Sequence, residues 1–231
     1  MKYVLVLSSA LLLASVSTAS AQPSASENKR LDEATSVLRE FQATPDKGIP
    51  EPLWSRAECV TVIPNLKKAA FVFGGEYGKG VMSCRENGRW SAPVFIELEK
   101  GSAGFQIGAE QVDLVLLMMN REGVDKLLKD KVNLGADASV AAGPVGRTAS
   151  AGTDAELHAG ILAYSRAQGA FAGINLSGGV LRADKGANER VYGPTVAPSD
   201  VLFGNAVAVP ASAQAFVRRL SLETRATTGP K

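Results

Sequence analysis

The sequence predicts an α+β fold in which a twisted, glycine-rich antiparallel β-sheet or partial barrel is flanked by helices. Of the 23 glycines, 20 lie between Gly74 and Gly193, threaded through runs of Val, Ile, Phe and Ala. Several of these runs alternate between apolar and polar residues, as half-buried strands do. Glycine weakens a strand interior unless the sheet bends or two backbones approach closely, so this many glycines predict a tightly curled sheet.

The first 21 residues are typical of a secretory signal peptide. Lys2 is followed by an apolar stretch at 3–16 and by the small residues Ala19-Ser20-Ala21. The stretch is too short to span a bilayer as a retained helix. We expect cleavage after Ala21, and because no Cys follows that site we do not expect a lipid anchor. The mature protein is therefore expected to be exported, to the periplasm or the medium.

The charge balance argues against a nucleic-acid partner. One of the 25 basic residues, Lys2, lies in the leader, which leaves 24 against 23 acidic residues. Nucleic-acid binders normally carry a basic excess or a stripe of Lys and Arg. Attraction to an anionic surface would have to come from a local patch. The remaining residues divide into a helix and linker at 22–49, one domain at 50–223 and a tail at 224–231.

The mature chain begins with a predicted amphipathic helix. From Ser26, the expected N-cap, to Phe41, apolar residues recur at three- and four-residue spacing. Residues 44–48, Thr-Pro-Asp-Lys-Gly, end the helix. Its apolar stripe could pack on the domain or insert into a membrane interface. Because acids accompany Lys29 and Arg30 on the polar face, packing is favoured.

Short strands are expected through the glycine-rich part of the chain. They are 59–63, 69–73, 80–84, 93–99, 109–120, 132–142, 156–164 and 170–181. We expect turns at Pro64-Asn65, across residues 74–80, and at Glu86-Asn87-Gly88, where Asn-Gly is a strong hairpin signal. Residues 109–120 could form a buried helix, but apolar and polar residues alternate at their start as in a strand. Helices are expected at 53–57, 121–129, 187–192, 199–203 and 210–223.

Cys59 and Cys84 are expected to form a disulfide between neighbouring strands. In an exported chain a disulfide is the default for two cysteines, and its loop closure would contribute about 3 kcal/mol. The alternatives are a metal pair or a catalytic thiol. A metal would need two further ligands, which a single histidine and scattered carboxylates do not readily supply. We therefore expect no metal and no cofactor.

Each motif typical of an enzyme lacks a residue or a spacing that its chemistry requires. Residues 74–80, Gly-Gly-Glu-Tyr-Gly-Lys-Gly, lack the four-residue glycine spacing and the Ser or Thr after Lys79 that a phosphate loop requires. The sole histidine, His158, has no Gly-x-Ser-x-Gly element to serve. Glu97 and Glu99 share one strand face, which is more often a solvated edge than a glycosidase pair. We expect no enzymatic activity.

Basic residues concentrate where acids are sparse. Arg147, Arg166, Arg182 and Lys185 lie in the later part of the glycine-rich segment, and Lys67 and Lys68 form a pair near a turn. Guanidinium groups match phosphate geometry, and the small residues around Arg147 would let a ligand approach. The alternative is that these residues are separate solvated charges or single ion pairs.

Eight blocks between about residues 53 and 193, taken in order, resemble the SYLF family, also described as the Ysc84-type lipid- and actin-binding domain. They are Ala57-Glu-Cys-Val-Thr-Val-Ile-Pro64, Gly74-Gly-Glu-Tyr-Gly-Lys-Gly-Val81, Trp90-Ser-Ala-Pro93, Gly104-Phe-Gln-Ile-Gly-Ala-Glu110, Gly143-Pro-Val-Gly-Arg147, Tyr164-Ser165, Gly169-Ala-Phe-Ala-Gly173 and residues 188–192. The resemblance implies a β-rich core with helices and affinity for phosphoinositides or other anionic phospholipids. It also implies actin binding in some eukaryotic members. The leader and the two cysteines resemble the exported bacterial branch.

These observations predict a non-enzymatic, exported phospholipid-binding protein, peripheral to the membrane, that acts at the cell envelope. Head-group contacts are expected from Lys67, Lys68, Lys79, Arg147, Arg166 and Arg182. Apolar side chains beside the glycine turns would meet acyl chains. The alternative function is a protein-interaction or envelope-scaffolding module, whose partner would be a protein.

Overall fold

The computed structural model describes residues 23–43, 48–144, 159–167, 170–174, 176–204 and 207–225. It confirms the α+β class: strands β1 to β8 form one curled half-barrel sheet with helices on both faces. The helices are α1 (Ala25–Gln42), α2 (Glu51–Arg56), α3 (Glu122–Lys129), α5 (Lys185–Tyr192), α6 (Pro198–Phe203) and α7 (Gln214–Arg225). The strands are β1 (Cys59–Glu86), β2 (Arg89–Trp90), β3 (Val94–Met118), β4 (Lys131–Asn133), β5 (Val140–Ala142), β6 (Ile161–Ala167), β7 (Ala170–Gly173) and β8 (Val180–Ala183).

The dominant element is a long antiparallel ribbon made of β1 and β3. Its pairing runs from Cys59 opposite Met118 to Met82 opposite Val94, so the predicted turns at Pro64-Asn65 and at 74–80 are wrong. Pro64-Asn65 is a bulge, where the register shifts and Asn65 has a φ of 52°. The glycine-rich residues 74–80 pair with β3 as an extended strand.

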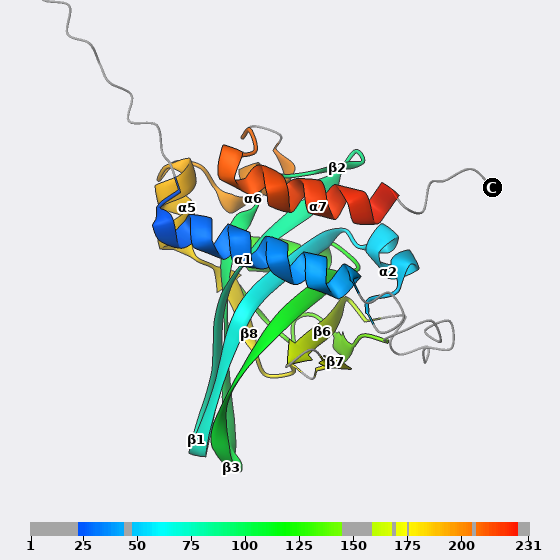
Figure 1. The fold of residues 1–231 in the computed structure, drawn as a ribbon. Helices are drawn as coiled ribbons and strands as arrows, with labels where there is room; N and C mark the ends of the chain where they lie inside the picture. Colours follow the sequence, from blue (N-terminus) through cyan, green and yellow to red (C-terminus); the bar gives the residue numbers. More distant parts are fainter. Residues whose placement is uncertain are drawn as a thin grey trace, which may run out of the picture.

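The ribbon folds back on itself near its middle, at the lower end of Figure 1. The two ends of β1 therefore meet, and Cys59 and Cys84 form a disulfide with their Cα atoms 4.0 Å apart. The Arg85 N–H donates to the carbonyl oxygen of Glu58 at 2.8 Å beside it. The disulfide prediction is confirmed, but it joins two ends of one bent strand rather than two separate strands.

Close backbone approach, not a turn, accounts for the glycines in the returning half of β1. A Cβ added at Gly80 would lie 2.1 Å from the carbonyl oxygen of Val62, and one at Gly78 would lie 2.5 Å from a side-chain carbon of Ile63. Both distances are shorter than atoms tolerate. Gly80 faces backbone, which cannot move aside cheaply, so that position requires glycine, whereas an alanine at Gly78 would require the Ile63 side chain to shift. The glycine argument for a curled sheet holds even though the turn prediction does not.

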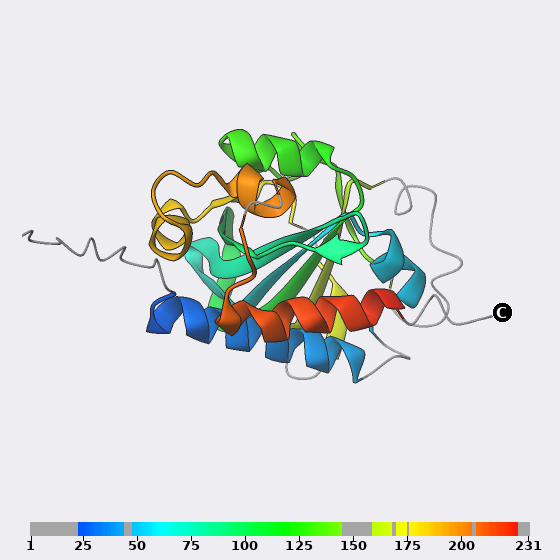
Figure 2. The same ribbon diagram turned by 90° about the horizontal axis from the view of Figure 1, so that it is seen from above.

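The sheet lies between two helical layers, each with its own core. Figure 2 shows α1 (blue) and α7 (red) on one side and α3 (green) on the other. The first core joins α1, α2 and α7 to one face of the sheet, with Phe95, Val115 and Phe216 among its buried residues. The second core joins α3 and α6 to the opposite face, which includes Met82 and Ile96. Successive residues of β3 thus enter opposite cores, as the predicted alternation at 93–99 requires.

Helix α1 confirms the predicted amphipathic helix and decides between its two environments. The apolar stripe, from Leu31 to Phe41, is buried in the first core, so the helix packs on the domain. The N-cap is Ser24 rather than Ser26, because Ser24 forms a reciprocal capping box with Glu27 three residues later. Within the part of the chain that the structure describes, no helix is long and apolar enough to cross a bilayer.

The remaining elements agree with the sequence in part. The Glu86-Asn87-Gly88 hairpin is confirmed, with positive φ at Asn87 and Gly88, and 109–120 is strand rather than helix. Residues 132–142 divide into β4 and β5 around Gly135, whose φ is 91°. The predicted strand 170–181 likewise divides, into β7 and β8. Residues 156–158 lie outside the described residues.

Candidate functional site

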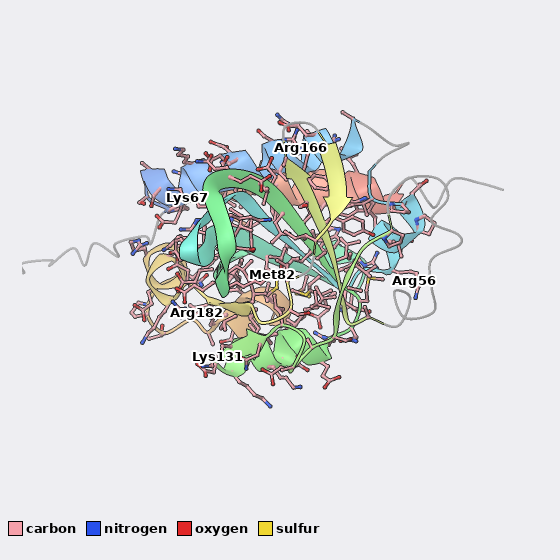
Figure 3. The ribbon with its side chains drawn as sticks, turned by 90° about the horizontal axis from the view of Figure 1, so that it is seen from below. Arg56, Lys67, Met82, Lys131, Arg166 and Arg182 are labelled. Atoms are coloured by element: carbon pink, nitrogen blue, oxygen red, sulfur yellow. A yellow bond between two sulfur atoms is a disulfide. The ribbon has the colours of Figure 1, made fainter. Side chains whose placement is uncertain are left out.

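The structure divides the predicted head-group cations among three places. Lys79 and Arg182 come together, whereas Arg166 lies on β6 and Lys67 and Lys68 lie on the outgoing half of β1. Figure 3, seen from the free end of the ribbon, labels Lys67, Arg166 and Arg182 on separate parts of the sheet. Arg147 lies outside the described residues. The six residues do not form one patch among those described.

Lys79 belongs to a partly buried ion-pair network centred on Asp184, the N-cap of α5. An oxygen of Asp184 accepts hydrogen bonds from Lys79 at 2.9 Å and from Arg30 of α1 at 3.1 Å. Burial opposes ionisation of Asp184, but the hydrogen bonds from Lys79 and the Ala187 backbone outweigh it and lower its pKa. The hydrogen bond to Asp184 in turn raises the pKa of Lys79. The network therefore stays charged and ties α1, β1 and α5 together.

Arg182 extends this network through two carboxylates on one strand face. Its guanidinium donates to Glu97 at 2.6 Å and to Glu99 at 2.8 Å. Glu97 also accepts from the Tyr77 hydroxyl at 3.3 Å and lies 3.8 Å from Lys79. Glu97 and Glu99 share one strand face, as predicted, and both carboxylates bind the guanidinium of Arg182. An anionic ligand here would compete with carboxylates already in place.

Arg166 forms a second clamp, which joins α1 to the sheet. It donates to Asp113 of β3 at 2.8 Å and forms an ion pair with Glu40 near the end of α1. Asp113 also accepts the Asn65 N–H of the β1 bulge at 3.1 Å. Burial raises the pKa of Asp113, against the effect of the Asn65 hydrogen bond.

Sequence reasoning missed a buried carboxylate at the other end of α1. Glu27 is fully buried, and its carboxylate accepts hydrogen bonds from Arg190 at 2.7 Å and from the Ser24 backbone at 3.0 Å. Burial alone would raise its pKa, but these hydrogen bonds lower it from 4.5 to about 2. The Ser-x-x-Glu pattern at Ser24 was the available signal for this residue's capping role.

Several of the resembling blocks have structural roles. The side-chain amide of Asn188 pairs with the backbone of Phe95, accepting its N–H at 2.9 Å and donating to its oxygen at 2.8 Å. Gly143 lies against the ring of Tyr164, where any Cβ would come within 2.0 Å of a ring carbon. These contacts fix α5 on β3 and β5 beside β6. Sequence blocks that are far apart in the chain are therefore in contact in the fold.

A cleft of about 630 Å³ opens where the ion-pair network reaches the surface. The end of α3, strand β8, the start of α5 and residues 194–198 surround it. Its charged lining mixes Lys129, Arg182 and Lys185 with Glu97, Asp130, Asp184 and Glu189. A mixed lining suits a small polar or zwitterionic group better than a strongly anionic one. The described residues contain no group of three His, Cys, Asp or Glu that could hold a metal ion.

Lys67 and Lys68 differ from the other cations because they lie outside this network. Lys67 is exposed and Lys68 is half-buried, and neither forms an ion pair with an acid among the described residues. In register, Lys67 is opposite Gln111 and Lys68 is opposite Glu110. Since successive strand residues point to opposite faces, the two lysines put positive charge on both sides of the ribbon.

Comparison with known proteins identifies related sequences. A family model described as "Ysc84: Las17-binding protein actin regulator" matches residues 99–222. Protein YSC84 of Saccharomyces cerevisiae is 35% identical over 210 residues, which cover 87% of this chain and 43% of that protein. SH3 domain-containing YSC84-like protein 1 of Rattus norvegicus is 34% identical over 189 residues, covering 79% of this chain and 54% of that protein.

LAS seventeen-binding protein 3 of Saccharomyces cerevisiae is also similar, 34% identical over 163 residues that cover 69% of this chain and 35% of that protein. The chain thus spans about half or less of the length of these relatives. The family model covers more than half of the 231 residues, and its description is that of a binding protein and regulator. The chain therefore belongs to the Ysc84/SYLF domain family.

Proposed function

We propose that this chain is a non-enzymatic, exported phospholipid-binding protein that acts at the cell envelope through anionic head groups, such as those of phosphoinositides. The observation that carries the proposal is that some basic residues of the sheet are paired with carboxylates and others are not. Lys79, Arg166 and Arg182 each meet two carboxylates. Lys67 and Lys68 meet none among the described residues, and they lie on a ribbon that extends beyond the helices (Figure 1).

An anionic membrane is drawn to cations whose charge is still available. Each Lys or Arg held near such a surface contributes about 1 kcal/mol of attraction, and the effect fades within a Debye length. Lys79, Arg166 and Arg182 offer little of this because their positive charges are already paired with carboxylates. The exposed Lys67 and the neighbouring Lys68 can reach a planar surface without breaking an ion pair. Arg147, outside the described residues, is proposed to contribute in the same way.

Export is supported by the leader-like N-terminus and by the disulfide. Cys59 and Cys84 are both fully buried, and their bond suits an oxidising compartment. If the proposal is right, mass spectrometry of the exported protein will find a chain that begins at Gln22 with Cys59 and Cys84 oxidised. An unprocessed N-terminus would contradict it.

A second candidate function is a protein-interaction or envelope-scaffolding module. It is favoured by the family description, which names binding to Las17, and by the name of LAS seventeen-binding protein 3. The same exposed ribbon would then meet a polypeptide. Retention of a defined protein partner in detergent, together with no binding to vesicles, would select this alternative.

The test is co-flotation with vesicles of neutral or anionic phospholipid at low and high salt. The protein should begin at Gln22, because the apolar leader would bind vesicles by itself. We expect stronger flotation on anionic vesicles at low salt and a decrease as salt rises. Replacing Lys67 and Lys68 by Gln should weaken binding to anionic vesicles.

The matched control replaces Lys29 and Arg39 by Gln, which removes the same charge from the exposed face of α1. This control should bind as the wild type does. Absence of flotation on every composition would overturn the proposal.

A further inference from the structure

The tip of the β1–β3 ribbon, defined as residues 69–75 and 101–109, carries no charge. Its sequences are Ala-Ala-Phe-Val-Phe-Gly-Gly and Gly-Ser-Ala-Gly-Phe-Gln-Ile-Gly-Ala, without Asp, Glu, Lys, Arg or His. Charged residues bound both segments at each end: Lys68, Glu76, Lys100 and Glu110. Two uncharged segments, each with a charged residue at both ends, are unexpected for a ribbon that is surrounded only by water.

The tip is also the part of the fold that reaches furthest from the helices. β1 and β3 both turn over there, and Figure 1 shows this end of the ribbon opposite α7 and beyond every labelled helix. Pairing continues through it, with Phe73 opposite Ala103, Gly74 opposite Ser102 and Gly75 opposite Gly101. A planar surface that approaches from this end meets the tip first.

A lipid interface suits this backbone. Backbone N–H and C=O groups that enter a bilayer need partners within the protein, and an antiparallel ribbon supplies them between its two strands. Residues 69–72 would extend roughly 13 Å at about 3.3 Å per residue, comparable with the depth of about 5–10 Å that interfacial segments reach. Among the described residues no further strand pairs with the outer edges of the tip, so entry would stop at the head-group and acyl boundary.

The residues that border the tip suit the polar side of that boundary. Lys67 is exposed with no acid partner among the described residues, and a lysine can extend its ammonium group toward phosphates while its stem stays in apolar surroundings. Tyr77 is 41% exposed and is one of the large exposed hydrophobic residues in the described part of the chain. Tyrosine is enriched at membrane interfaces because its ring prefers the apolar side of the interface and its hydroxyl prefers the polar side.

From these observations we infer that the tip enters the interface of an anionic phospholipid bilayer, with Lys67 and Lys68 at the level of the phosphates. The inference rests on the proposed function and names the element that carries it. It assigns the salt-resistant part of membrane binding to the tip as a segment, whose sequence includes the large apolar residues Phe71, Val72, Phe73, Phe105 and Ile107. Helix α1 is not needed for insertion, because its apolar stripe is buried in the first core.

The experiment compares two variants by flotation on anionic vesicles in high salt. Phe71→Ser with Phe105→Ser should lower the partition coefficient at least tenfold. Leu222→Ser is the matched control: Leu222 is 52% exposed on α7, at the end of the molecule opposite the tip, and its loss should change partitioning less than twofold. Thermal unfolding of each variant, followed by circular dichroism, verifies that the fold is retained.

A second measurement does not depend on a loss of binding. In Phe71→Trp, brominated phospholipids should quench the new indole, whereas Trp54 and Trp90, 3% and 5% exposed, give a background that the wild type defines. If the wild type floats but the serine variant floats equally well and the new indole is not quenched, the tip inference fails and the proposed function stands. If the wild type binds no vesicle of any composition, both fail.

Discussion

The root and the tip of one ribbon share antiparallel strand pairing but differ in their cover of helices and in their charge. The root, residues 59–66, 78–86, 94–98 and 112–118, is covered by helices on both faces, closed by a disulfide and edged by paired charges. The tip has the same antiparallel pairing and many glycines but reaches beyond the helices and has no charged residue. The cover of helices and the presence of charged residues, rather than strand type, therefore separate the part that stabilises the domain from the part proposed to contact lipid.

The glycines of the two regions give the largest expected contrast. Gly80→Ala would place a methyl group 2.1 Å from the Val62 carbonyl oxygen, whereas a Cβ at Gly101 meets nothing within 4 Å. Backbone cannot move aside cheaply, so Gly80→Ala should lower the free energy of unfolding by about 3 kcal/mol or more. Gly101→Ala should change it by less than about 1 kcal/mol. Urea unfolding followed by circular dichroism measures both, and equal stabilities would refute the close approach in the root.

The disulfide is expected to give the next largest effect, again confined to the root. Cys59 and Cys84 are 25 residues apart in sequence, so replacing both by Ala should cost about 3 kcal/mol in the chain-entropy account. For a domain of this size the melting temperature would fall by roughly 6–12 °C. Scanning calorimetry measures the loss. A reductant should leave the melting temperature of the double variant unchanged. If the wild type and the double variant melted at the same temperature, the bond would not contribute to stability.

The docking of α1 on the root can be probed through acid. The pKa of Glu27 is lowered from 4.5 to about 2 in the folded protein, so its contribution to stability is present above pH 4.5 and disappears as the pH falls toward 2. Glu27→Gln should lose about 2 kcal/mol at neutral pH, since a buried charge-assisted hydrogen bond is lost, and its stability should fall less steeply over that range. Urea unfolding at a series of pH values measures this. Glu33→Gln, in an exposed i,i+4 pair with Lys29, should behave as the wild type.

Local signals explain which elements were predictable from the sequence. Helix α1 and the Asn87-Gly88 hairpin were found because a cap, a helical period or a positive-φ pair is written in a few adjacent residues. Pro64-Asn65 and residues 74–80 carry the same local signals as turns. Whether such residues form a turn or a bulged, close-packed strand depends on pairing with β3, about 15 to 50 residues away in sequence, which no local pattern encodes.

The candidate site was predictable to a smaller extent, for the same reason. The charge of Lys79 and Arg182 predicts a role for them, but no local pattern marks Glu97 and Asp184 as the carboxylates that bring them together. Arg166 pairs with Glu40 and Asp113, which are 126 and 53 residues away in sequence. The charge of a residue is read from the sequence, whereas its neutralisation depends on the tertiary fold.

The smallest expected effects separate a paired cation from an unpaired one. Arg166→Gln removes the clamp that holds α1 and leaves Asp113, whose pKa burial already raises, without its guanidinium. It should cost about 1 kcal/mol of stability, measured by urea unfolding. Lys67→Gln should change stability by less than about 0.5 kcal/mol but weaken binding to anionic vesicles roughly fivefold, which corresponds to about 1 kcal/mol per lysine. If instead Arg166→Gln weakened vesicle binding at unchanged stability and Lys67→Gln did not, the head-group contact would lie at the Arg166 clamp on β6 beside the root. The proposed division between paired and unpaired cations would then be wrong.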